Sequence, residues 1–250
     1  MRTVSRNLIY LALLALWDAS SRLGWLPEYI VGPTVIAVEF VRMLFVEDLI
    51  QHIGSSLFRS FSGFFLGAGL GVILGLLAGF SRATDEVLSP LISVTYPVPK
   101  IAIFPILMVW FGIGDTSKVV VIAMASFYPT FINSFYGAKG TERVLVWSAQ
   151  NMGASIHQLF YKVVLPAALP QIFAGMRVAL ALSFVLLFAS EMINARHGLG
   201  ALIMLAEQGL QFDIMYVAIL SIAILGFASD RLLGLVRKRV LRWQPQVILK

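Results

Sequence analysis

The sequence predicts an all-α integral membrane protein with about six transmembrane helices. Of the 250 residues, 59% are hydrophobic and only 13% are charged, whereas a soluble domain is typically about 45–50% apolar and about 25% charged. The apolar residues also gather in long segments that approach the roughly 20 residues an α-helix needs to cross a bilayer. The formal net charge is +6, and the basic residues lie at the ends of these segments. This placement indicates membrane topology rather than nucleic-acid binding.

Six segments have the length and composition of membrane spans. They cover residues 7–25, 60–80, 88–110, 117–136, 172–192 and 214–235, within one membrane domain that extends over residues 1–250. The first segment could instead be a signal peptide, because basic residues precede its apolar run. That run continues to Leu16 and then meets Asp18 without a small-residue cleavage site. We therefore interpret it as a retained first span.

Two long connections join the spans. Residues 26–59 form a polar stretch in which the piece 35–45 is amphipathic and suited to the membrane surface. Residues 137–171 join spans four and five. Cytoplasmic loops are enriched in lysine and arginine, and a cytoplasmic N-terminus would give that side Arg2, Arg6, Arg82, Lys139, Arg143, Lys162, Arg237, Lys238, Arg239, Arg242 and Lys250. Both termini and the 137–171 connection are therefore predicted to be cytoplasmic.

Glycines recur along the second predicted span at a four-residue spacing, which places them nearly on one helix face. They are Gly63, Gly67, Gly71, Gly75 and Gly79. Small residues on one face let another helix backbone approach closely inside a membrane. We favour tight packing within one subunit, and a sliding or subunit-facing surface is the alternative.

The third predicted span is interrupted by prolines. Tyr96, Pro97, Pro99 and Lys100 lie together inside its apolar stretch. Each proline removes a backbone donor, and irregular backbone at membrane depth survives only when it is buried in protein or lines a cavity. The segment is therefore either a kinked helix beside a pathway or a kink that shapes packing, with Lys100 reaching toward a surface.

A motif lies in the connection between spans four and five. Ala149, Gly153, Leu165 and Pro166, with Val163 in the position of an isoleucine, have the spacing of the "EAA" loop. The chain thereby resembles the permease subunits of type I ABC importers. Trp147 and Ser148 stand where the family usually has an acidic residue and alanine, which puts any contact of that acidic side chain in doubt.

Further motifs narrow the resemblance to the nitrate, sulfonate and taurine branch of these permeases. They are Pro166-Ala-Ala-Leu-Pro170, Gly175-Met-Arg177, Lys100-Ile-Ala-Ile-Phe-Pro105, Trp110-Phe-Gly112-Ile-Gly114, Ser190-Glu191-Met-Ile193 and Gly198-Leu-Gly200. They extend from span two to span six. The resemblance implies a small organic or inorganic anion as substrate, such as a sulfonate, nitrate or an aromatic acid, although relatives also carry neutral vitamin precursors.

The residues around the motif predict a short amphipathic helix over 154–164. Gly153 is the residue type that most readily takes a positive φ, and Pro166 and Pro170 are expected to end the helix before span five. Periodicity alone favours an interfacial helix on lipid headgroups. The resemblance implies instead a helix that couples to an ATPase, through Ala149, Gly153, Ala154, Ser155, His157, Phe160, Leu165 and Pro166.

The chain lacks a phosphate-binding G-x-x-x-x-G-K-[ST] loop, since Gly137-Ala-Lys-Gly140 has the wrong spacing. We therefore expect no enzyme activity and no cofactor in the chain itself. The resemblance implies two copies of a cytoplasmic ATPase subunit that binds ATP and Mg, a second copy of this permease, and an external or periplasmic substrate-binding protein. It also implies the bacterial inner membrane as the location.

Candidates for the translocation pathway are fewer, and the notable ones are Tyr96, Pro97, Pro99, Lys100 and Glu191. Glu191 lies near the outer end of span five, where an ionisable residue is a functional candidate. A structural role is favoured, in which it binds Arg196 or a backbone donor and holds Gly198-Leu-Gly200 in shape. Arg177 could meet an anion, but a lipid headgroup is its more ordinary contact.

Two other classes of function remain as alternatives. A self-sufficient channel or secondary transporter often shows paired broken helices, and only one interrupted span is visible. An intramembrane enzyme needs clustered His, Asp or Glu at membrane depth, and none is visible. Three dispersed histidines and no cysteine also argue against a metal site.

Overall fold

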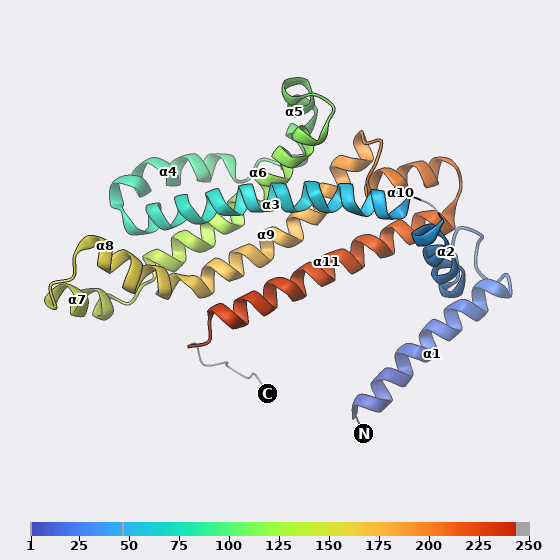
Figure 1. Ribbon diagram of the computed structural model, residues 1–250, viewed down its shortest axis with the longest axis horizontal. Coiled ribbons are helices and arrows are strands. Elements are labelled where there is room, and N and C mark those ends of the chain that lie inside the picture. The colour runs from blue at the N-terminus through green and yellow to red at the C-terminus, as the bar shows by residue number, and fades with distance from the viewer. Residues whose placement is uncertain (1, 47, 244–250) are drawn as a thin grey trace. The chain divides into compact units, whose positions relative to one another are not determined.

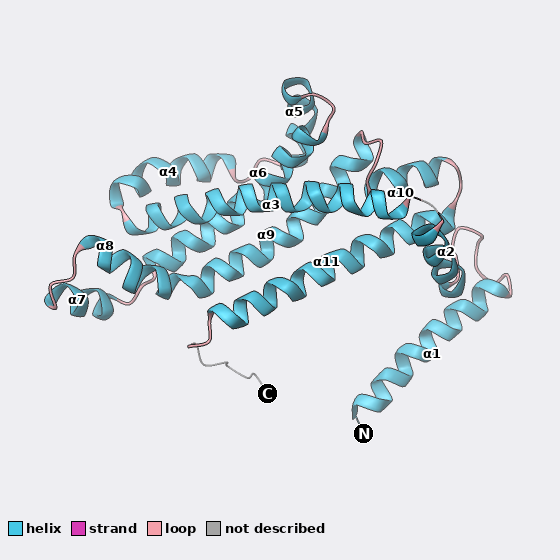
Figure 2. Cartoon of the chain, in the orientation of Figure 1, coloured by secondary structure: helices cyan, strands magenta, loops and turns pink. Residues whose placement is uncertain are grey.

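The computed structural model describes residues 2–46 and 48–243 and is helical throughout, with no strand in these ranges (Figure 1, Figure 2). The all-helical prediction is therefore confirmed. The helices are α1 (Arg2–Arg22), α2 (Pro33–Phe45), α3 (Leu49–Phe80), α4 (Arg82–Thr95), the 3-10 helix η1 (Lys100–Ile103), α5 (Phe104–Phe111), α6 (Asp115–Lys139), α7 (Arg143–Asn151), α8 (Ile156–Leu159), the π-helical turn η2 (Phe160–Val164), α9 (Leu165–Ile193), α10 (Leu199–Gln208) and α11 (Phe212–Val240).

Four helices in the described ranges are long and apolar enough to cross a membrane: α3, α6, the continuous helix Ile156–Ile193, and α11. A fifth candidate is the pair formed by α4 and Lys100–Phe111, which is bent by 84°. These five coincide with the predicted spans two to six. The first span, 7–25, falls on α1, which is not among the five, so six spans remain a prediction.

Two boundaries differ from those expected. Helix α3 begins at Leu49, inside the stretch that was predicted to be a polar connection. The 137–171 connection is also shorter than expected, because α6 continues to Lys139 and α9 begins at Leu165. At α3 the helix continues through polar residues such as Gln51 and His52, which hydropathy alone assigns to a loop, and at α9 it continues through Pro166 and Pro170, which were expected to interrupt it.

The chain forms two compact units. The first contains residues 1–56 and 191–224, and the second contains residues 57–190 and 225–250. The expectation of a single membrane domain stays a prediction. In the first unit, Asp18 accepts hydrogen bonds from Arg22 (2.8 Å) and from the backbone N–H of Thr34 (3.0 Å). Asp18 thereby joins α1 to the start of α2, where Pro33 occupies the first turn.

The second unit is built on close contact between α3 and α6. A Cβ atom added to any of the five spaced glycines would lie no more than 2.8 Å from a carbonyl oxygen of α6. The pairs are Gly63 with Val119, Gly67 with Ala123, Gly71 with Phe127, Gly75 with Phe131, and Gly79 with Phe135. Both members advance by four residues, so the two helices run parallel in a fixed register. The glycine face therefore lies against α6 of the same chain.

The prediction that Pro166 and Pro170 end the motif helix is wrong. One helix continues from Ile156 to Ile193 and contains both prolines. Before Pro166 the backbone widens into the π turn η2, where the N–H of Leu165 donates to the carbonyl of Phe160. The hydrogen-bond ladder already shifts there, so the missing proline donor falls where the regular pattern is interrupted. Prolines inside spanning helices are also tolerated when neighbouring helices pack around them.

Candidate functional site

The turn of the EAA-like motif is built by Ala149 and Gly153. The Gly153 N–H donates to the carbonyl of Gln150 (2.9 Å), and the Ala154 N–H donates to the carbonyl of Ala149 (3.0 Å). This pair of hydrogen bonds is a Schellman motif, which ends α7 and needs a left-handed residue after the C-cap. Gly153 supplies that conformation with φ of +80°. The motif's alanine and glycine therefore fix a sharp reversal of the chain.

A capping box starts the helix that follows. The Gln158 N–H donates to the Ser155 Oγ (3.3 Å), while the Ser155 N–H donates to the Gln158 side-chain oxygen (2.9 Å). Such reciprocal bonds satisfy two backbone donors at a helix N-terminus. Ser155, Ile156 and His157 are exposed, and Ala154 is partly buried. The segment thus presents a rigid surface made from a turn and the first turn of a helix.

The helix that follows the exposed turn packs on the protein interior through aromatic and aliphatic side chains. The ring of Phe160 meets Phe80 edge to face, with centroids 5.2 Å apart. Phe160 and Leu165 pack on a cluster of buried residues from α3, α6 and the motif helix, namely Leu76, Ala138, Val164, Ala168 and Ile172. Pro166 is partly buried in the first turn of α9. A displacement of the turn would therefore be transmitted directly to three helices.

Lys100 caps the first helix of the bent pair formed by α4 and Lys100–Phe111. Its ammonium donates to the carbonyls of Thr95 (2.9 Å), Tyr96 (3.0 Å) and Val98 (2.6 Å), and lies 4.1 Å from the ring centroid of Tyr128. A lysine in this place satisfies carbonyls at a helix C-terminus that lack intrahelical donors. Lys100 is thus a cap for α4, which explains a charge inside an apolar stretch. Tyr96, Pro97 and Pro99 are exposed beside it.

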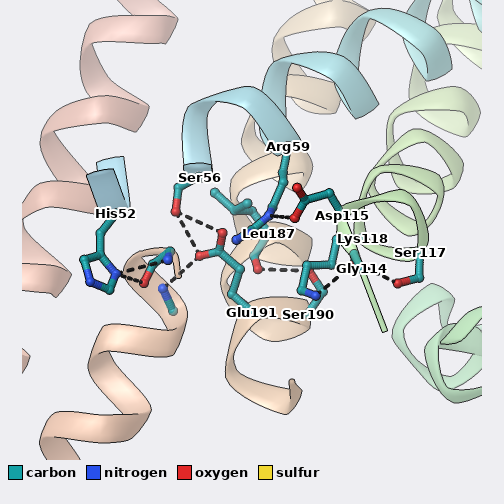
Figure 3. Close-up of polar contacts among 12 residues, drawn as sticks. His52, Ser56, Arg59, Gly114, Asp115, Ser117, Lys118, Leu187, Ser190 and Glu191 are labelled. Atoms are coloured by element: carbon teal, nitrogen blue, oxygen red, sulfur yellow. Dashed lines mark hydrogen bonds and ion pairs between the residues drawn. The ribbon is translucent and has the colours of Figure 1, made fainter. Parts of the chain in front are cut away.

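Among the described residues of the first unit, Glu191 is the most deeply buried acidic side chain, with 1% of its surface exposed. The Ser56 hydroxyl lies 3.0 and 2.9 Å from its two carboxylate oxygens, and the Gly200 N–H donates to one of them (2.9 Å). Figure 3 shows the carboxylate between α3 and the backbone that leads into α10. Hydrogen bonds of this kind offset the free-energy cost of removing a carboxylate from water.

Gly198 completes this cluster. Its φ is +128°, and a Cβ atom at this position would overlap the Glu191 carboxyl group. The Leu199 N–H donates to Ser56 Oγ (2.9 Å). His52 Nδ1 lies 3.1 Å from the Gly198 nitrogen and 2.9 Å from its oxygen, so it accepts from the amide or donates to the carbonyl according to its tautomer (Figure 3). The geometry accords with the structural role expected for Glu191, through a backbone donor.

Arg177, which was considered as a contact for an anion, forms an ion pair with an acidic residue of α11. Its guanidinium makes two hydrogen bonds with Asp230 of α11, of 2.6 and 2.8 Å, within the second unit. This fork-to-fork geometry is the strongest form of such a pair. Arg177 therefore has a protein partner in Asp230, and its contact with a headgroup stays a prediction. Among the described residues, no group of three His, Asp or Glu could hold a metal ion.

Comparison with known proteins identifies the class. The profile of the family described as "binding-protein-dependent transport system inner membrane component" matches residues 70–242. The chain belongs to this family. It is an ABC importer permease, a transport component rather than an enzyme, and residues 70–242 include the motif turn and Glu191.

Individual relatives cover most of the permease. SsuC of Escherichia coli (strain K12), named for the transport of aliphatic sulfonates, is 36% identical over 239 residues, which are 95% of this chain and 91% of that protein. The taurine transport system permease protein TauC of the same strain is 35% identical over 197 residues, with 79% and 72% covered. The riboflavin transport system permease protein RibX of Chloroflexus aurantiacus is 32% identical over 233 residues, with 93% and 87% covered.

Several residues that organise the permease were missed from sequence. Ser56 and His52 lie in the stretch interpreted as a polar connection, and Asp230 lies in the last span, far along the chain from Arg177. A weak signal existed for Asp230, since an acidic residue inside a spanning helix usually has a partner. None existed for Ser56, because serine is common in loops and its contact depends on the tertiary structure.

Proposed function

We propose that this permease forms the translocation pathway of an ATP-driven importer for a small organic anion, of the sulfonate class, which an external binding protein delivers. Support for the substrate class comes from SsuC and TauC, which match this chain over 95% and 79% of its length. Selectivity is shared with the binding protein, so the permease needs only moderate discrimination of its own. Two copies of the permease enclose the pathway.

The turn at Gly153 and the helix start at Ser155 dock onto a cytoplasmic ATPase subunit, of which two copies bind ATP and Mg. The observation that carries this proposal is the Schellman turn followed by the capping box, with Ser155, Ile156 and His157 exposed. These hydrogen bonds hold the exposed turn in one conformation, which suits a surface that docks on another subunit. ATP-driven closure of the two ATPase subunits then moves the spans through the helix Ile156–Ile193.

The decisive experiment is co-purification from the native membrane with a C-terminal tag. Wild-type permease is expected to bring down a phosphate-loop ATPase in equal amount. Gly153→Val should reduce the bound ATPase at least about tenfold, since a β-branched residue at positive φ costs of order 1–3 kcal/mol and distorts the turn. Nothing lies within 4 Å of a Cβ added at Gly153, so steric overlap is not the cause.

Gly153→Asn is the matched control, because asparagine tolerates the left-handed region. It should retain the ATPase while carrying a side chain of similar bulk. Equal binding by the Val variant and wild type would refute docking through this turn. A permease that purifies alone and transports in liposomes without ATP would instead establish a self-sufficient channel or secondary transporter.

A second substrate class has support of its own. RibX, named for riboflavin transport, matches 93% of this chain. Taurine-stimulated and riboflavin-stimulated ATP hydrolysis of the purified complex, each with its own binding protein, separates the two classes.

A further inference from the structure

A half-open cavity of about 370 Å³ lies at the surface of the second unit, between α4 and α6. Small-molecule sites commonly have volumes of about 300–1,000 Å³. The apolar part of its wall comes from α6 and one residue of α4. The polar part consists of Asp85, Ser89 and Ser93 of α4 and Tyr96 at its C-cap, with Tyr136 and Lys139 of α6. The first four recur at three- and four-residue spacing and so form one polar stripe.

An ion pair stands at one end of the cavity. Lys139 Nζ lies 2.9 Å from Asp85 Oδ2 and 4.6 Å from the centroid of the Phe135 ring. The other carboxylate oxygen, Oδ1, accepts a hydrogen bond from the Ser89 hydroxyl. The side chain of Lys139 is 56% exposed and that of Asp85 only 23%. The ammonium is therefore the more accessible of the two charges.

Each partner can leave the pair without losing all its interactions. Asp85 would keep the Ser89 hydroxyl, and it lies in the first turn of α4, where the helix dipole favours a negative charge. Lys139 would keep its position over the Phe135 ring. An entering anion would find the ammonium, together with the hydroxyl donors of Tyr96 and Tyr136 along the wall, whereas the Ser93 hydroxyl donates to the Ser89 carbonyl (2.8 Å). An entering cation would find a carboxylate that is mostly covered.

We propose that this cavity binds a small organic anion whose acid group takes the place of the Asp85 carboxylate on Lys139. The Asp85 carboxylate then competes with the bound anion for the Lys139 ammonium. The competitor keeps binding weak, and a site on a transport pathway must release its solute as readily as it receives it. This inference rests on the proposed function and adds to it a particular site and a residue that sets its affinity.

The chain contains no cysteine, which permits a direct test of charge selection without transport. Ser93→Cys places a single thiol on the cavity wall. In membrane vesicles that expose both faces, its labelling rate is measured with sulfonatoethyl methanethiosulfonate, an ethanesulfonate, and with the cationic trimethylammonioethyl analogue. The ratio of the two rates reports the charge that the cavity favours.

In this background, Asp85→Asn should raise the ratio of anionic to cationic labelling about tenfold, because it removes one unit charge about 12 Å along α4 from the thiol at intermediate dielectric. Lys139→Gln should lower the ratio by a similar factor. Butanesulfonate added in excess should slow labelling of the Asp85→Asn protein more than that of the parent. The comparison variant is Glu86→Gln, which removes a charge of the same sign from the exposed Arg82–Glu86 pair (3.0 Å) outside the cavity wall. Because the Glu86 side chain is 66% exposed and screened by water, the ratio should change several-fold less than with Asp85→Asn.

Equal ratios in all four proteins would overturn the proposal. So would a thiol that neither reagent reaches, since that result would show the cavity to be filled by a second copy or by lipid. Labelling does not require the ATPase subunit. A charge-selective cavity in a permease that binds no ATPase would refute the proposed function while the cavity site stands, and the reverse outcome would refute the cavity site alone.

Discussion

At the scale of single residues, a buried carboxylate determines the path of the chain between α9 and α10. Glu191 accepts hydrogen bonds from Ser56 and from the Gly200 N–H, and Gly198 leaves room for it. A buried charge needs such donors, since each unsatisfied partner costs about 1–3 kcal/mol. Glu191 is therefore a positioning residue for the backbone that enters α10.

Gly198→Ala should destabilise the first unit by roughly 2–4 kcal/mol, because the new methyl group overlaps the Glu191 carboxyl and the backbone has a positive φ. The check is the thermal aggregation midpoint of the detergent-purified permease. Gly209→Ala is the control, since a Cβ there has no neighbour closer than 3.4 Å. Equal midpoints for the two variants would show that the Glu191 cluster contributes nothing to stability.

Lys100 is a second residue whose contacts depend on the tertiary structure. A lysine between prolines in an apolar stretch suggested either a pathway or a surface, and both stay predictions; the structure adds that Lys100 caps α4 through the carbonyls of Thr95, Tyr96 and Val98. Sequence reasoning identified the residue as unusual but could not find its acceptors, because three carbonyls converge on it only after the chain bends by 84°.

At the scale of elements, the close packing of α3 on α6 depends on a row of five glycines. The spacing of four predicted a helix-packing face, and the structure places that face against α6 in parallel register. An ion pair continues the same register one turn earlier, where Arg59 meets Asp115 at 2.7 Å (Figure 3). The spacing could indicate a face but not the partner, since any helix backbone can meet a row of glycines.

Gly71→Leu should prevent assembly or reduce the yield of folded permease at least about fivefold, because a side chain there meets Thr130 and the Phe127 carbonyl. Fluorescence-detected size-exclusion chromatography of a tagged protein measures the yield. Gly69→Leu, on the same helix with nothing within 4 Å, is the matched control. A sharp monodisperse peak for the Gly71 variant would contradict the packing described.

The motif helix shows where propensity rules fail. Pro166 and Pro170 were expected to end it, yet the π turn η2 carries the chain into α9 without a break. Pattern reasoning found the amphipathic segment and its turn, because those depend on neighbours in sequence. It missed the continuity, because a change in hydrogen-bond register leaves no mark on hydropathy.

At the scale of the whole molecule, hydropathy located spans two to six, since each carries a long apolar core. It placed the start of α3 too late, because residues such as His52 and Ser56 face protein and not lipid. The pairs Asp85–Lys139 and Arg177–Asp230 join residues that are distant in sequence. Nothing in a single sequence brings such partners together. Lys250, part of the basic tail used to predict orientation, lies outside the described residues.

Orientation can be tested on the same cysteine-free chain. Ser148→Cys and Gln208→Cys introduce thiols at two exposed positions, on α7 and at the end of α10. A membrane-impermeant maleimide applied to intact spheroplasts should label Gln208→Cys at once and Ser148→Cys only after permeabilisation, because basic residues flank the first position. The reverse pattern would place the motif turn outside and remove its access to a cytoplasmic ATPase.

Backbone contact along successive turns leaves α3 and α6 no freedom to slide past each other inside the second unit. A shift by one residue would drive a side chain into a carbonyl, and the next permitted register is a full glycine step away, about 6 Å along the axis. We therefore expect α3 and α6 to move together as one rigid unit along the contacts between them. A rearrangement during transport would have to occur elsewhere, and the described part of the second unit offers two interruptions of regular helix, the 84° break after Thr95 and the widened turn before Leu165.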